Sequence, residues 1–150
     1  MANTDTKILI HLVFSTKKRE CTISPRIRAR LFPFIGGIAR GKGVTAIQVG
    51  GIQDHVHMLL GMPTTISVAE AAKTIKGVSS RWIHEEFPNC GFTSWQEGYG
   101  AFSIGASQID RTVAYILGQE EHHRRETFQD EFLRFLAANQ VEFDPRYIWD

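Results

Sequence analysis

Two histidines separated by one residue, His55 and His57, lie inside the apolar segment DHVHMLL at 54–60. The alternation predicts a β-strand, in which every second side chain points to the same face of a sheet. Both imidazoles would then share one face, and Val56 would point to the other. Side by side, two imidazoles can bind one divalent metal ion, or they can simply hydrogen-bond to neighbours in a half-buried strand. The pair alone leaves both interpretations open.

A second group of side chains that could take part in catalysis lies on a predicted helix. This helix begins at Ser107 and runs to about His122. At about 100° per residue, one stripe of this helix faces the core and its flank carries polar side chains. The core stripe holds Ile109, Val113 and Ile116, and the flank holds Arg111, Tyr115, Gln119 and His122. A tyrosine one turn from a glutamine can be a nucleophile beside a metal ligand, or a half-buried boundary tyrosine beside a solvated neighbour.

The elements that must position these residues follow the order strand, helix, strand, strand, helix, strand. Strands are predicted at 8–14, 44–49 and 55–60 and within 92–104; helices are predicted at 25–41 and 67–87, then at 107–122 and 127–139. The link from Gly50 to Asp54 suits a hairpin turn between two antiparallel strands. The order predicts an α+β ferredoxin-like sandwich, with an antiparallel sheet, helices on one face and appended C-terminal helices.

Composition narrows the class of protein. With 150 residues and 43% hydrophobic content, one domain spanning residues 1–150 is expected. The start of the chain lacks a signal-type pattern and no apolar run reaches the ~18 residues of a membrane span, so a cytoplasmic protein with no membrane partner is expected. Cys21 and Cys90 lie outside any C-x-x-C pair, which favours reduced thiols.

One segment nearly matches a phosphate-binding loop but lacks a residue that such a loop needs. Gly36, Gly41 and Lys42 fit the spacing G-x-x-x-x-G-K, but Gly43 replaces the hydroxyl residue that the loop needs. The segment also ends a predicted helix rather than following a strand. No nucleotide cofactor is therefore expected.

Four sequence blocks occur together in one order: HLVFSTK at 11–17, DHVHMLL at 54–60, WQEGYGAFS at 95–103 and YILGQEEHHR at 115–124. Together they resemble the single-tyrosine transposases of small bacterial insertion sequences, the IS200-like members of the HUH nuclease superfamily. The letters HUH denote histidine, a bulky hydrophobic residue and histidine. The resemblance covers nearly the whole chain.

This resemblance implies a DNA transposase that cuts and rejoins single-stranded DNA at the ends of an insertion element, where it recognises hairpins. It implies Tyr115 as the nucleophile that forms a 5′-phosphotyrosine, and His55, His57 and Gln119 as ligands of Mg²⁺ or Mn²⁺. It also implies a homodimer joined through sheet edges, in which the Tyr115 helix can lie against the histidines of the partner.

The formal net charge is only +1, so DNA contacts are expected from local clusters rather than from a basic surface. The candidates for DNA backbone contacts are Lys73, Lys76, Arg81, Arg111, Arg124 and Arg125, and the candidates for base stacking are Trp82, Trp95 and Phe102. A solvated face is the more common role of such basic residues, and core packing is the more common role of such aromatic residues. Alternative functions are a domesticated relative linked to repeated palindromes, a nucleic-acid-binding regulatory module that does not cleave, and a metal-dependent phosphoesterase that uses water.

Overall fold

A four-stranded antiparallel sheet forms the centre of the computed structural model, which describes residues 3–149. The strands are β1 (Leu9–Ser15), β2 (Thr45–Ile52), β3 (His55–Gly61) and β4 (Gly100–Ile104). They lie in the order β2-β3-β1-β4, and every neighbouring pair is antiparallel. Two helices, α1 (Pro25–Gly41) and α2 (Val68–Glu86), connect the strands. This is the predicted ferredoxin-like arrangement.

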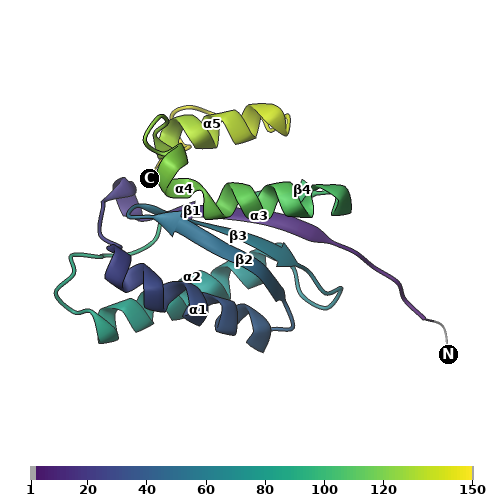
Figure 1. The fold of residues 1–150 in the computed structure, drawn as a ribbon, viewed down its shortest axis with the longest axis horizontal. Coiled ribbons are helices and arrows are strands. Elements are labelled where there is room, and N and C mark those ends of the chain that lie inside the picture. Colours follow the sequence, from purple (N-terminus) through teal and green to yellow (C-terminus); the bar gives the residue numbers. More distant parts are fainter. Residues whose placement is uncertain (1–2, 150) are drawn as a thin grey trace.

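Helices cover both faces of the sheet (Figure 1). Helices α1 and α2 pack on one face over the main core, to which β1 and β3 contribute Leu12, Phe14, Val56 and Met58. The other face carries α3 (Ile109–Leu117), α4 (Gln119–His122) and α5 (Phe128–Ala138). A smaller core joins α5 to the sheet there through Val13, Phe102, Phe128, Phe132 and Leu136. The appended C-terminal helices therefore close the second face.

The turn before the histidine strand is tighter than predicted. Strand β2 continues through Gly50 and Gly51, so that only Gln53 and Asp54 separate it from β3. The predicted link over 50–54 was too long, because Gly50 and Gly51 pair with His57 and Val56 in the sheet. Only a glycine fits at position 51, since a Cβ there would lie 2.2 Å from the carbonyl oxygen of His55. The tight turn places His55 at the first position of β3.

The predicted single helix from Ser107 to His122 is divided. A short 3-10 turn at Ala106–Gln108 precedes α3, so Ser107 is not its N-cap. Gly118 then ends α3, with its N–H donating to the carbonyl oxygens of Ala114 and Tyr115, and α4 begins at Gln119. Gly118 is thus a joint between two helices rather than a glycine within one helix.

Within the segment at 92–104 that was predicted to contribute a strand, only β4 forms a continuous ladder with a neighbouring strand. Trp95 forms an isolated bridge with Thr16, and its ring packs on Phe14 in the main core. The indole N–H donates to Ser79 Oγ at 2.9 Å. Burial of this large side chain, rather than ladder pairing, fixes the path of the segment before β4.

Three further expectations concern the two cysteines, a membrane-spanning helix and the segment that resembles a phosphate-binding loop. Cys21 and Cys90 are both free. Within residues 3–149, no helix has the length and apolar character that crossing a membrane requires. Lys42 caps the end of α1, as expected for a segment that is not a phosphate-binding loop.

Gly50 gives a test of how closely α3 presses on β2. A Cβ at this position would lie 2.6 Å from the Ile116 carbonyl oxygen and 2.7 Å from its Cγ2 atom. We expect Gly50→Ala to lower the free energy of unfolding by about 1–3 kcal/mol, because α3 must move away. Urea unfolding measures this. Gly37→Ala in α1, where a Cβ meets nothing within 4 Å, is the control and should be neutral or stabilising; equal stability of both variants would contradict the close contact.

Candidate metal and nucleophile centre

His55 and His57 lie side by side on the sheet face covered by α3, α4 and α5. Both side chains are fully buried, and their ring centroids are 5.0 Å apart. Val56 points into the main core on the opposite face. The predicted alternation along β3 is therefore confirmed, and it aims both imidazoles at the C-terminal helices.

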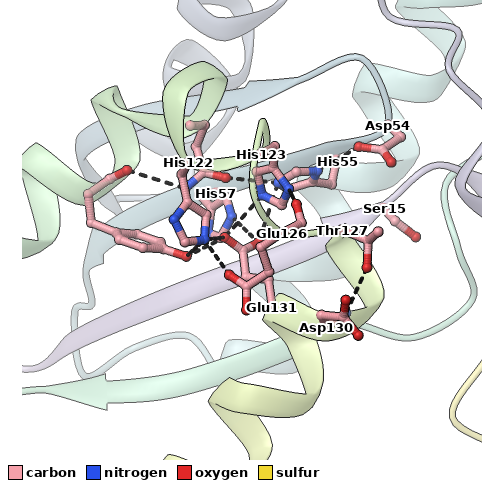
Figure 2. A network of polar contacts seen from close by, with 12 residues as sticks. Ser15, Asp54, His55, His57, His122, His123, Glu126, Thr127, Asp130 and Glu131 are labelled. Atoms are coloured by element: carbon pink, nitrogen blue, oxygen red, sulfur yellow. Dashed lines mark hydrogen bonds and ion pairs between the residues drawn. The ribbon is translucent and has the colours of Figure 1, made fainter.

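Each of these imidazoles is held by one of its ring nitrogens. His55 Nδ1 donates to the Asp54 carboxylate at 2.7 Å, and His57 Nδ1 is hydrogen-bonded to His11 Nε2 at 2.8 Å. Such outer partners fix the ring orientation of metal-binding histidines. The Nε2 atoms are left to point into a shared interior space (Figure 2).

Gln119 lies against His55 in an arrangement that a cation would stabilise. Its amide nitrogen donates to the Tyr115 carbonyl oxygen at 3.2 Å, which orients Oε1 toward His55 Nε2 at 2.9 Å. Because His55 Nδ1 carries the hydrogen given to Asp54, a neutral ring has a lone pair on Nε2. Two lone pairs at this distance need a proton or a metal ion between them.

Glu131 on α5 is a central residue of the site that the sequence analysis missed. It is fully buried, and its Oε1 lies 2.9 Å from His57 Nε2 and 3.4 Å from His55 Nε2. A carboxylate is almost never fully buried without partners. The signal in the sequence was its place between Phe128 and Phe132, on the stripe of α5 that faces the core.

His123 completes a set of four possible metal donors. The ligand atoms of His55, His57, His123 and Glu131 all lie within 4.8 Å of one another. His123 Nε2 is 3.1 Å from Glu131 Oε2 but is not aligned as a hydrogen bond, so within the described residues this buried nitrogen has no hydrogen-bond partner. Neighbouring ligands of one small ion lie about 3 Å apart, so the spacing fits a metal.

The ionisation of His57 and Glu131 also suits a metal. Burial lowers the pKa of His57 to about 4 against the opposing effect of Glu131, and burial with the nearby His57 lowers the pKa of His11 to about 3. Burial alone would raise the pKa of Glu131, but the closely placed His123 and the hydrogen bond with His57 outweigh it and hold that pKa far below its usual value. Neutral imidazoles and an ionised carboxylate are the forms that bind metals.

Tyr115 places its hydroxyl beside this donor set. The hydroxyl donates to Glu131 Oε2, lies 3.2 Å from His122 Nε2 and accepts from Arg134 at 3.0 Å. Burial, together with the hydrogen bond and charge of Glu131, raises the pKa of Tyr115 above its usual value. The resting tyrosine is therefore a protonated hydroxyl held at the edge of the site.

Half of the basic residues predicted to contact DNA lie away from the site. Lys73, Lys76 and Arg81 lie on α2, which packs on the opposite face of the sheet. Arg111, Arg124 and Arg125 lie on the site's side of the sheet. Arg125 lines a shallow pocket of about 380 Å³ together with Tyr115 and His122. The pocket therefore borders the Tyr115 side chain.

The aromatic residues predicted to stack on bases serve packing instead. Trp95 and Phe102 are 5% and 4% exposed, in the main and the smaller core respectively. Trp82 stacks on Phe34 at a ring distance of 4.6 Å on the α1–α2 side. Burial leaves the faces of Trp95 and Phe102 covered, so these two residues have the core-packing role that is more common for aromatic side chains.

The family model for IS200-like transposases matches residues 4–119 of this chain. The chain belongs to this family. The match contains His55, His57, Tyr115 and Gln119, and it ends before His123 and Glu131. This IS200-like chain therefore draws part of its site from a segment beyond the family match.

Two relatives illustrate the similarity. The transposase for insertion sequence element IS200 of Salmonella typhimurium is 27% identical over 129 residues, which cover 83% of this chain and 84% of the relative. The ISDra2 transposase TnpA of Deinococcus radiodurans is 23% identical over 116 residues, which cover 74% and 83%.

Two solved structures share the fold of this IS200-like chain. One, a Deinococcus radiodurans R1 chain assigned as a transposase, has a TM-score of 0.64 and 23% identity, and the match covers 79% of this chain and 95% of that one. The other is a REP-associated tyrosine transposase bound to a REP hairpin, with a TM-score of 0.58, 14% identity and coverage of 82% and 74%. At these identities the likeness shows the fold alone.

Proposed function

We propose that this transposase cuts and rejoins single-stranded DNA at the ends of an insertion element through a covalent bond to Tyr115. The observation that carries this proposal is the position of the Tyr115 hydroxyl. It donates to Glu131, whose other oxygen lies against His57. A nucleophile and a candidate metal-binding set thus share one carboxylate.

His55, His57 and Glu131 would hold the divalent ion, with Gln119 and His123 within reach as further ligands. The imidazole nitrogens in this set favour Mn²⁺, whereas Mg²⁺ prefers oxygen ligands. A bound ion would polarise the phosphate at the cleavage point.

In the reaction, the Tyr115 hydroxyl oxygen forms a bond to the phosphorus while the bond to the 3′ oxygen breaks. The tyrosine proton passes to water, because Glu131, whose pKa is held far below its usual value, is a weak base. The departing 3′ oxygen takes a proton from water. The product is a 5′-phosphotyrosine and a free 3′ hydroxyl. Because one ester replaces another, rejoining needs no nucleotide cofactor.

The DNA partner is proposed to be a single strand that carries hairpins, as supported by the structural relative bound to a REP hairpin. Arg111, Arg124 and Arg125 lie on the side from which the cleaved strand would approach. The basic residues of α2 could reach only a more distant part of the hairpin. Strands β2 and β4 form the sheet edges, and pairing of such edges is the proposed route to a homodimer.

The geometry within one chain favours a site that each subunit completes with its own tyrosine. The Tyr115 ring lies 5.7 Å from the His57 ring of the same chain, between ring centroids. We therefore expect co-expressed mixed dimers of His57→Ala and Tyr115→Phe chains to remain as inactive as either variant alone. Restored cleavage in verified mixed dimers would show the sharing between subunits that the family resemblance implies.

The proposed function is tested with hairpin-bearing single strands from the DNA that flanks the gene. With Mn²⁺, the wild-type chain should form a protein–DNA complex that resists denaturation in detergent, and chelation of the metal should prevent it. Cleavage without a covalent complex would indicate a phosphoesterase that uses water. Binding without cleavage would indicate a regulatory module.

A further inference from the structure

Arg134 is an unassigned cation at the nucleophile. It follows Glu131 by three residues on α5, and its Nη2 atom lies 3.0 Å from the Tyr115 hydroxyl. The Arg134 side chain is 48% exposed, whereas Glu131 is fully buried. The hydroxyl is thus flanked by a buried carboxylate on one side and a solvent-facing guanidinium on the other.

The guanidinium is held in one orientation. Glu126 accepts from Arg134 Nε at 3.2 Å and from Nη2 at 3.1 Å, which makes a two-point ion pair. Arg134 also packs its charge over the Tyr115 and Phe135 rings, at 5.8 and 5.2 Å from their centroids. An arginine fixed in this way presents its remaining donors without a large loss of side-chain freedom.

Charge decides what this cation can bind. A phosphate about to be attacked lies about 3–3.5 Å from the nucleophilic oxygen, so its non-bridging oxygens fall among the groups that surround the hydroxyl. Glu131 and Glu126 repel an anion there. Arg134, in contrast, carries a positive charge and donates directly to the Tyr115 hydroxyl. The pocket beside Tyr115 supplies the approach.

We propose that Arg134 binds a non-bridging oxygen of the phosphate that Tyr115 attacks. This inference rests on the proposed function and adds a substrate-contacting residue to it. Arginine suits the task because its fork of donors matches phosphate oxygens and it stays charged throughout the reaction. The contact would strengthen as negative charge grows on the phosphate oxygens during the attack.

The test measures binding in the non-cleaving Tyr115→Phe background, with a single strand whose cleavage-site phosphate is either normal or a neutral methylphosphonate. Adding Arg134→Gln should weaken binding of the normal strand about tenfold and leave binding of the methylphosphonate strand unchanged. Glu126→Gln, which removes the ion pair but keeps Arg134, is the control and should retain the preference for the charged phosphate.

Two further readouts separate this role from a structural one. In the Tyr115 chain, Arg134→Gln should slow formation of the covalent complex about 100-fold or more at saturating DNA, with unchanged Mn²⁺ affinity. Equal weakening for both strands, or no weakening for either, would overturn the phosphate contact. A wild-type chain that forms no covalent complex would overturn the proposed function instead, and the binding comparison would still decide the role of Arg134.

Discussion

Replacing His57 with alanine is expected to abolish both metal binding and DNA cleavage. His57 is fully buried, and its Nε2 lies 2.9 Å from Glu131 Oε1, so its loss removes one candidate ligand together with its hydrogen bond to the carboxylate. Mn²⁺ affinity should fall at least about 100-fold. Calorimetric titration with Mn²⁺ and a cleavage assay measure the two effects.

Two variants make this result specific. Tyr115→Phe should abolish cleavage but keep Mn²⁺ affinity and DNA binding within a few fold, because only the hydroxyl is removed. His84→Ala changes a histidine near the end of α2 that is hydrogen-bonded to the Thr93 carbonyl oxygen, and should alter neither property. Normal cleavage by His57→Ala at limiting metal would refute the assigned centre.

Glu131→Gln is expected to have the second-largest effect. The substitution keeps the size of the side chain but removes the charge that faces His57, His123 and Tyr115. Mn²⁺ affinity should fall about 10–100-fold, and cleavage should fall with it. Titration of each variant with Mn²⁺, together with urea unfolding, separates loss of the metal from loss of the fold.

The neighbouring Asp130 provides the matched control. Asp130→Asn makes the same acid-to-amide change on the same helix, but at an exposed position. It should leave Mn²⁺ affinity unchanged. If Glu131→Gln binds Mn²⁺ normally and Gln119→Leu does not, the third ligand is the glutamine that the family resemblance implies, and Glu131 serves only the tyrosine.

The local parts of this site could be predicted from the sequence. Alternation along β3 placed His55 and His57 on one face, and helical spacing placed Tyr115 next to Gln119; both arrangements hold because each depends on neighbours within a few residues. The ferredoxin-like arrangement also followed from the order of elements. The joint at Gly118 was not predicted, because helical periodicity continues across it.

The parts that were missed depend on long-range packing. Glu131 meets His57 across 74 positions of the chain, and His11 meets it across 46. Spacing within a segment carries no information about such pairs. For the same reason, spacing could not show that the basic residues of α2 lie on the opposite face of the sheet from the histidines.

The central claim is that Tyr115 carries the DNA during the reaction, and the most direct test is to identify the residue in the covalent complex. Wild-type chain would be incubated with Mn²⁺ and a hairpin-bearing single strand, the complex digested with protease and nuclease, and the modified peptide sequenced by mass spectrometry. The account predicts a nucleotide linked through its 5′ phosphate to Tyr115. A link to any other residue, or cleaved DNA with no linked peptide, would contradict it.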